Sequence, residues 1–273
     1  MLVLLPFFCF AAVLSVAVCL GAGFSGWTLA GMLALLFTAF FVAALALLLL
    51  VIGALSLLID MNKPVRKLNG FFCGFTKYVM GVVCAIMRVH VTLTGGEKLP
   101  EGRWLLVSNH PSGFDIVTAL WGLRRQDVAF IMKPDVLRIP AVGRFAVKIG
   151  CLAIDREDDR AALKTILAAA DMLKNGVTSF CIYPEGTRDY GKELLPFRNG
   201  AFKVAQKAKT PVVVMATEGT EKIMKNFPFR RTDVTLRILA VFPAEQVTAQ
   251  KTAEISRRAR ECMERTPAQY ENN

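Results

Sequence analysis

Two residues that could exchange a proton lie five positions apart in the chain. His110 and Asp115 belong to the segment NHPSGFD at residues 109–115, which follows a short apolar run at 104–107. Imidazole is the side chain whose ordinary pKa lies nearest neutrality, and the chain contains only one other histidine, His90. A carboxylate that binds one ring nitrogen leaves the other free to act as a base. The pair therefore has the residue types needed to remove a proton from a hydroxyl group.

This chemistry requires a break in the regular backbone between the two residues. Along a continuous helix, five residues rotate the chain by about 500°, so the two side chains would point in different directions. Pro111 and Gly113 supply the break. We expect His110 in a loop after a strand and Asp115 in the first turn of a helix, where the helix dipole favours a carboxylate. The alternative is that both residues only cap this loop and helix.

The hydrophobic pattern after residue 87 predicts an α/β domain. Helices are expected at 116–123, at 158–173 with Asp158 or Asp159 as cap, and at 251–264. Strands that alternate with helices indicate a mixed or mostly parallel sheet covered on both faces, with ligands beyond the carboxyl ends of the strands. The expected strands are 88–94, 104–107, 128–132, 151–154, 178–183, 211–216 and 235–242.

Two further strands are expected to end in polar residues. The strand at 151–154 runs into Asp155 and Arg156, and the strand at 178–183 runs into PEGTR at 184–188. Glycine lets backbone amides approach an anion, threonine adds a hydroxyl donor, and arginine can bind phosphate through two parallel hydrogen bonds. Either segment alone could equally be an ordinary turn or the solvated start of a helix.

The first 59 residues contain no charged side chain. A membrane span needs about 20 apolar residues, and this stretch holds enough for two, at 2–20 and 27–59, separated by the glycine-rich segment at 21–26. We therefore expect a transmembrane helical hairpin at 1–60. A cleaved signal peptide is the alternative for the first span, although the basic residues that begin such peptides are missing.

Charge predicts on which side of the membrane the rest of the chain lies. Lys63, Arg66 and Lys67 follow the second span, and positive charges in that position normally stay in the cytoplasm. The formal net charge of +11 arises entirely after residue 59. Nucleic acid, an anionic bilayer surface or acidic substrates could all account for it. The membrane anchor favours the latter two, so we expect an integral membrane protein with its catalytic domain on the cytoplasmic face and no nucleic-acid partner.

The residues after the hairpin divide into three further regions. We expect interfacial, membrane-associated helices at 61–90, a catalytic domain at 91–265 and a polar tail at 266–273. In the first of these, aromatic rings would lie in the membrane while Lys77 reaches toward water; a third crossing at 68–89 is the alternative. The seven cysteines form no close pair, which predicts reduced thiols and no metal site.

Four motifs follow one another in an order that resembles the glycerolipid acyltransferases, in particular those acting on 1-acylglycerol 3-phosphate. They are NHPSGFD at 109–115, GCLAIDR at 150–156, YPEGTR at 183–188 and TPVVVM at 210–215. The resemblance covers roughly residues 89–241. It implies transfer of a fatty acyl group from acyl-coenzyme A or acyl carrier protein to the sn-2 hydroxyl of lysophosphatidic acid, giving phosphatidic acid without a cofactor.

The resemblance also implies roles for particular residues. His110 matches the catalytic histidine of the family and Asp115 its charge partner; the fourth motif is associated with the acyl donor. Tyr183 stands where the family usually has phenylalanine. The residues expected at the acceptor's phosphate are Lys133, Arg156, Glu185, Gly186, Thr187 and Arg188.

Other functions stay open at this point. Within the family, the acceptor could be glycerol 3-phosphate or another lysolipid. A lipid hydrolase would use the same histidine and aspartate with water as acceptor. A lipid-binding membrane protein without catalytic activity would explain the hairpin and the positive charge, but it would have no use for this pair.

Overall fold

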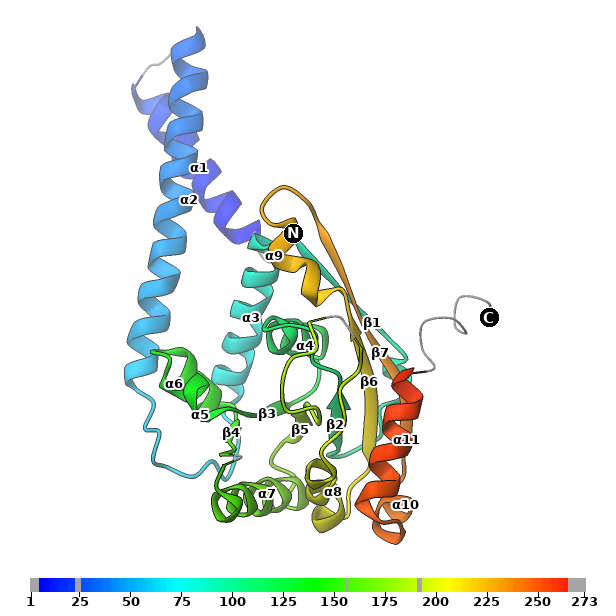
Figure 1. The fold of residues 1–273 in the computed structure, drawn as a ribbon. Coiled ribbons are helices and arrows are strands. Elements are labelled where there is room, and N and C mark those ends of the chain that lie inside the picture. Colours follow the sequence, from blue (N-terminus) through cyan, green and yellow to red (C-terminus); the bar gives the residue numbers. More distant parts are fainter. Residues whose placement is uncertain (1–4, 23–25, 156, 191–192, 265–273) are drawn as a thin grey trace. The chain divides into compact units, whose positions relative to one another are not determined.

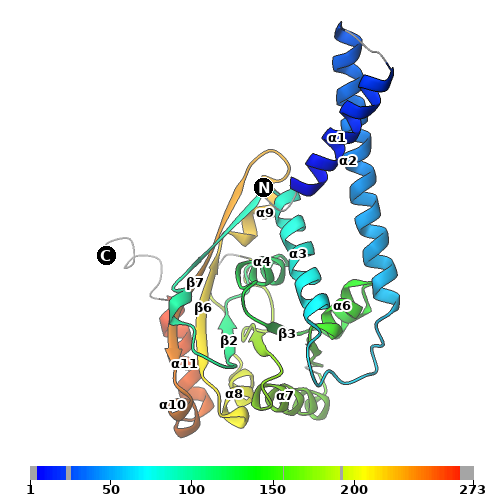
Figure 2. The ribbon, with the colours of Figure 1, turned by 180° about the vertical axis from the view of Figure 1, so that it is seen from behind.

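The computed structural model describes residues 5–22, 26–155, 157–190 and 193–264. The chain forms two compact units, Met1–Asp60 and Met61–Asn273. The first unit contains two long helices, and the second contains a sheet covered by shorter helices (Figures 1 and 2).

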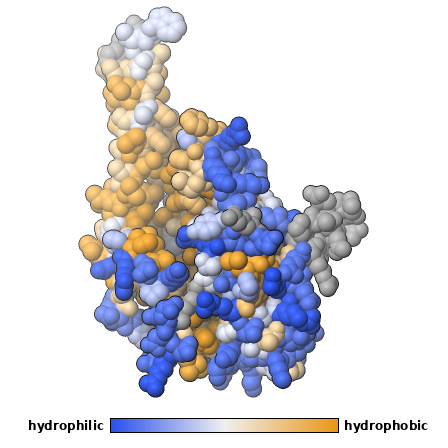
Figure 3. Space-filling view, viewed as in Figure 1, coloured by the Kyte–Doolittle hydropathy of each residue, from blue (hydrophilic) through white to orange (hydrophobic). Residues whose placement is uncertain are grey.

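The N-terminal unit consists of α1 (Leu5–Ala22) and α2 (Gly26–Leu57). Both helices are long and apolar enough to cross a membrane, and Figure 3 shows hydrophobic colours around them. Ser15, Thr38 and Ser56 each donate their hydroxyl to a carbonyl of their own helix, so these groups do not need water as a partner. The two helices predicted from the apolar pattern are confirmed, and their composition indicates membrane association.

The second unit is built on a seven-stranded mixed sheet in the order β1-β7-β6-β2-β5-β3-β4. Neighbouring strands run parallel except β6 and β7, which are antiparallel. Consequently β2, β3, β4, β5 and β6 all end at one edge of the sheet. The strands are β1 (Val89–Thr94), β2 (Leu105–Ser108), β3 (Val128–Met132), β4 (Leu152–Ala153), β5 (Ser179–Ile182), β6 (Val212–Glu218) and β7 (Thr232–Phe242).

Helices cover both faces of this sheet. A Cβ added at Gly122 of α4 would overlap with Cδ1 of Leu236 on β7. The glycine therefore allows α4 to pack closely against one face of the sheet. Helix α11 lies along β6 and β7 on the opposite side from α4, and α10 packs against α8 (Figures 1 and 2). The helices are α3 (Gly70–Ile86), α4 (Asp115–Gly122), α5 (Pro134–Arg138), α6 (Val142–Lys148), α7 (Asp159–Lys174), α8 (Lys203–Ala208), α9 (Ile223–Asn226), α10 (Ala244–Ala249) and α11 (Thr252–Glu264).

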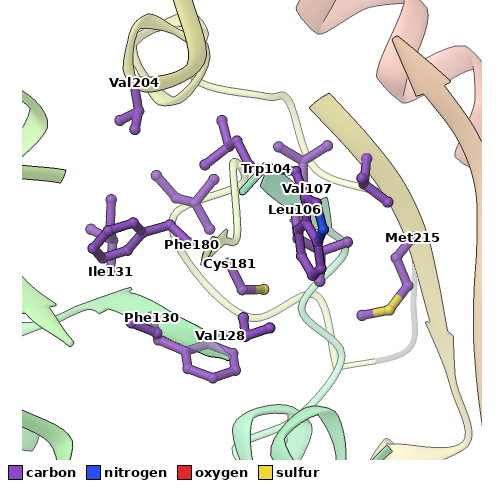
Figure 4. Close-up of a cluster of buried hydrophobic side chains, with 14 of the residues drawn as sticks. Trp104, Leu106, Val107, Val128, Phe130, Ile131, Phe180, Cys181, Val204 and Met215 are labelled. Atoms are coloured by element: carbon purple, nitrogen blue, oxygen red, sulfur yellow. The ribbon is translucent and has the colours of Figure 1, made fainter. Parts of the chain in front are cut away.

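The hydrophobic core is formed by the central strands. Figure 4 shows buried side chains gathered around the central strands, among them Phe130 of β3, Phe180 of β5 and Trp104, which directly precedes β2. All three are almost completely buried, and each contributes about 1.5–3 kcal/mol through the apolar surface that it removes from water. This core makes the carboxyl ends of the strands a rigid platform for the loops that follow them.

Helix α3 lies in the region expected at the membrane interface. Gly81 packs against Trp121 of α4, while Phe71 near the start of the helix is exposed. Lys77 does not reach toward water as predicted: its Nζ lies 3.1 Å from Asp127 Oδ1 in an ion pair. That prediction was wrong because Asp127, the ion-pair partner of Lys77, is 50 residues away in the chain. Local hydrophobic periodicity gives no information about so distant a partner.

All seven predicted strands are present, and so are the predicted helices, which correspond to α4, α7 and α11. Asp158 caps α7 by accepting hydrogen bonds from the amides of Arg160 and Ala161. The short helices α5, α6, α8, α9 and α10 were not predicted. With four to seven residues each, they are too short to produce a clear helical period in the sequence.

Candidate active site

The structure joins the two residues that the sequence singled out. His110 follows β2, Asp115 begins α4, and Nδ1 of the imidazole lies 2.6 Å from Asp115 Oδ2. The histidine side chain is 17% exposed and the aspartate side chain 1% exposed. Because Nδ1 faces the carboxylate, Nε2 is the ring nitrogen left to act on a substrate.

The carboxylate of Asp115 is held by three donors. Its Oδ2 also accepts a hydrogen bond from the amide of Ser112 at 2.9 Å. Its Oδ1 accepts one from the hydroxyl of Thr220 at 2.5 Å. Thr220 lies after β6 and is fully buried. Both oxygens are therefore occupied, which fixes the orientation of the carboxylate toward His110.

The backbone of His110 is held by the segment after β5. Glu185 accepts hydrogen bonds from the amides of His110 and Leu195, one at each carboxylate oxygen and each at 2.9 Å. The carbonyl of His110 accepts from the amide of Asp189 at 3.0 Å. Burial is the main cause that raises the pKa of Glu185, while the two amide donors oppose the rise. Glu185, predicted at the acceptor's phosphate, thus lies buried and bonded to the protein's own backbone.

The imidazole ring is also fixed from the side. Tyr183 stacks on it with the ring centroids 4.2 Å apart and the planes 12° from parallel.

Asn109, the residue before the histidine, exchanges two hydrogen bonds with the backbone of Thr217, at 2.8 and 3.0 Å. The end of β2 is therefore tied to the end of β6, and the histidine projects from a rigid edge.

The remaining residues of the PEGTR segment lie at the surface of the same edge. Gly186 has a φ of 77°, a backbone conformation that favours glycine. Thr187 and Arg188 are exposed. The guanidinium of Arg188 lies beside Gly113, where an added Cβ would be 3.3 Å from its Nη2. A cation thus stands next to the loop that carries His110.

Lys133 and Arg156 are the two other residues predicted at the phosphate. Lys133 is exposed and directly follows β3, whose carboxyl end lies at the same edge as that of β5. The prediction for Arg156 lies outside the described residues.

Comparison with known proteins agrees with this geometry. Residues 90–218 match the family model described as Acyltransferase. The chain is 29% identical over 186 residues to a 1-acyl-sn-glycerol-3-phosphate acyltransferase of Saccharomyces cerevisiae, covering 67% of this chain and 61% of that protein. It is 28% identical over 170 residues to a protein of the same name from Salmonella typhimurium, covering 62% of this chain and 69% of that protein.

A solved structure shares the fold. The crystal structure of the 1-acyl-sn-glycerophosphate (LPA) acyltransferase PlsC from Thermotoga maritima superimposes with a TM-score of 0.55 at 25% sequence identity, covering 70% of this chain and 79% of that one. In sequence and in fold, the chain is therefore similar to acyltransferases.

The two buried cysteines nearest the site are poor candidates for nucleophiles. Cys181 is the cysteine nearest in sequence to the PEGTR segment, and burial raises the pKa of its thiol. Burial also raises the pKa of Cys151 to about 12. Both thiols therefore stay protonated and are poor nucleophiles at neutral pH.

Two contacts of the site, that of Thr220 with Asp115 and that of Glu185 with the His110 backbone, were not predicted from the sequence. Thr220 belongs to the polar segment EGTE at 218–221, which follows a predicted strand as the other site segments do, and this position is the signal that could have identified it. Glu185 was found, but its contact with the His110 backbone depends on β2 and β5 being neighbours in the sheet.

We predict that Glu185→Gln destabilises this protein. The amide side chain keeps one acceptor, so the amide of His110 or Leu195 would face an NH₂ group instead of an oxygen. Leaving one buried donor unsatisfied costs about 1–3 kcal/mol in the free energy of unfolding. Thermal melting of the purified protein in detergent, beside the exposed-site control Glu193→Gln, measures the loss; equal melting temperatures would contradict the bracing role.

Proposed function

We propose that this chain transfers a fatty acyl group from an acyl thioester to the sn-2 hydroxyl of a 1-acylglycerol 3-phosphate, which yields phosphatidic acid. The observation that carries the proposal is the His110–Asp115 pair, 2.6 Å apart at the carboxyl edge of the sheet. The names of the related proteins support the same reaction.

His110 acts as general base in this reaction. Nε2 takes the proton of the acceptor hydroxyl as its oxygen attacks the thioester carbon, and the thiol leaves with a proton. Asp115 keeps the imidazole in the tautomer that exposes Nε2 and offsets the positive charge that forms on the ring. The acyl group passes directly to the acceptor, so no acyl-enzyme intermediate is required.

Positive charge at the same edge would hold the acceptor's phosphate. Arg188 stands beside the His110 loop and Lys133 follows the neighbouring strand. Gly186, Thr187 and Arg156 are the other residues that would contact this phosphate. A bound phosphate would place the sn-2 hydroxyl near His110, and such positioning contributes strongly to rate.

A groove beside Tyr183 supports an acyl substrate. It has a cavity volume of about 540 Å³ and includes Pro184 and Gly186 of the PEGTR segment. Most of its wall is apolar, with Asp159, Arg198 and Lys203 as the charged lining residues. The aliphatic lining residues are Ile154, Ala162, Leu163, Ile166, Ile182 and Ala201. The donor is acyl-coenzyme A or acyl carrier protein, either of which carries the acyl chain as a thioester.

The experiment that tests the function is a product assay with purified protein and labelled acyl thioester. Acceptors would be lysophosphatidic acid, glycerol 3-phosphate and a choline lysolipid, each with both donors. We expect labelled phosphatidic acid from lysophosphatidic acid. Release of free fatty acid would instead indicate a hydrolase, and absence of turnover a binding protein.

A substitution at Arg188 tests the phosphate contact. Lysine keeps the charge but loses the two-pronged guanidinium, so Arg188→Lys should raise the KM for lysophosphatidic acid by roughly ten- to a hundredfold. The KM for the donor should change little. Steady-state kinetics with each substrate varied in turn measures both constants. Arg125→Lys, at an exposed position before the amino end of β3, serves as a charge-preserving control, and an unchanged acceptor KM in Arg188→Lys would contradict the assignment.

We also propose that the second unit lies on the cytoplasmic side of the membrane, because Lys63, Arg66 and Lys67 follow α2. A cysteine introduced by Lys98→Cys should then react with an impermeant maleimide only from the cytoplasmic side of sealed vesicles. The same is expected of Lys251→Cys. The parent protein measures the background from native cysteines. Labelling of either variant from the opposite side would contradict this topology.

A further inference from the structure

The connection between β6 and β7 carries a group of exposed apolar side chains. Met224 is 63%, Phe227 37% and Phe229 86% exposed. Ile223, on the other side of the short helix α9, is completely buried and anchors the segment. A single exposed hydrophobic residue is ordinary, but three within six positions indicate a contact surface.

The backbone of this segment is held in one shape. The amide of Phe227 donates to the carbonyl of Ile223 at 3.0 Å, and that of Arg230 donates to Asn226 at 2.8 Å. The side chain of Asn226 donates to the hydroxyl of Thr232 at 3.0 Å. The apolar side chains are therefore presented outward by a hydrogen-bonded turn.

Basic residues surround the apolar ones. Between residues 221 and 233 the chain has four basic and two acidic side chains. Asp233 pairs with Arg231 at 2.5 Å, and Glu221 lies 3.9 Å from Lys222. Aromatic and aliphatic side chains next to lysine and arginine are typical of segments that lie in the interface of an anionic bilayer. We call residues 222–231 the β6–β7 surface.

The β6–β7 surface begins at the candidate active site. Thr220, two residues before it, donates to Asp115, and β6 runs parallel to β2, whose end carries His110. At its other end, Thr232 donates to the carbonyl of Arg88, just after α3, in the region that the sequence predicts to be interfacial. The surface therefore begins at the carboxyl edge of the sheet, beside the candidate active site.

We propose that Met224, Phe227 and Phe229 insert into the interface of an anionic lipid bilayer while the basic residues of the β6–β7 surface bind lipid phosphates. This contact holds the carboxyl edge of the sheet against the membrane. If the proposed function is correct, on which this last step rests, a lysophospholipid can then reach His110 without leaving the bilayer.

A tryptophan introduced by Phe229→Trp tests the contact in the full-length protein. The protein is reconstituted in vesicles of phosphatidylcholine mixed with phosphatidylglycerol, and brominated phosphatidylcholine is added to quench tryptophans in the acyl region. We expect a loss of fluorescence beyond that of the parent protein, whose three tryptophans give the background. Lys174→Trp, at the end of α7 and before the amino end of β5, should show no additional loss.

Charge is tested in the same vesicles. Lys225→Gln together with Arg230→Gln should reduce the quenching of the Phe229→Trp tryptophan, and so should replacing phosphatidylglycerol with phosphatidylcholine. Quenching does not require turnover. Absence of acyl transfer activity would therefore overturn the proposed function but not the proposed membrane contact. Met224→Trp provides a second reporter if Phe229→Trp does not fold.

Quenching in both reporters no greater than in Lys174→Trp would overturn the proposal. So would a fluorescence change that depends on protein concentration rather than on brominated lipid, because that would identify a second copy of the chain as the partner.

Discussion

His110→Ala should lower kcat/KM for acyl transfer by about 10²- to 10⁴-fold, the usual contribution of a general base. The histidine lies in a loop, with its ring partly exposed and bonded to Asp115. Its backbone bond to Glu185 does not involve the ring and would persist in the variant. We therefore expect folding and membrane association to be retained. Turnover of labelled acyl thioester with lysophosphatidic acid, measured beside thermal melting, separates the two effects.

The other histidine is a matched control. His90 on β1 is more than half exposed and lies 3.5 Å from Asp233. His90→Ala removes the same side chain from the same protein but lies outside the proposed site, so its activity should match that of the parent. Near-normal activity in His110→Ala would end the general-base mechanism.

Asp115→Asn should also reduce kcat by roughly 10²- to 10⁴-fold while changing the acceptor KM little. The asparagine can place its oxygen where Oδ2 accepts from the His110 ring and from the Ser112 amide. Its NH₂ group then faces Thr220, whose hydroxyl can rotate to accept. The arrangement survives, but the negative charge that stabilises the imidazolium is lost. Steady-state kinetics measures this, and a kcat equal to that of the parent would show that charge on Asp115 is not needed.

Substitutions at Thr220 give a smaller, graded test of the same carboxylate. Thr220→Val keeps the shape of the side chain but loses one hydrogen bond to Asp115 Oδ1. A hydrogen bond to a charged group is worth about 1.5 kcal/mol or more, so we expect a fall in kcat of roughly tenfold. Thr220→Ser keeps the hydroxyl and should restore most of the rate. Equal losses in both variants would mean that Thr220 contributes packing alone.

Local patterns predicted much of this molecule. The charge-free run before residue 60 predicted α1 and α2, and the apolar runs between polar turns predicted all seven strands. The spacing of His110, Pro111, Gly113 and Asp115 predicted a loop histidine facing an aspartate at a helix start. Such features depend on the next few residues of the chain, where periodicity, glycine and proline act directly.

The supports of the site depend instead on the order of the strands. Glu185 reaches the His110 backbone because β5 lies beside β2, and Thr220 reaches Asp115 across 105 positions because β6 lies on the other side. The ion pair of Lys77 with Asp127 and the stacking of Tyr183 on His110 likewise join distant segments. Composition and spacing therefore determined the strands, the long helices and the reactive pair. Only the tertiary structure decided which buried partners hold that pair, because hydrogen bonds between distant segments exist only after the strands have assembled.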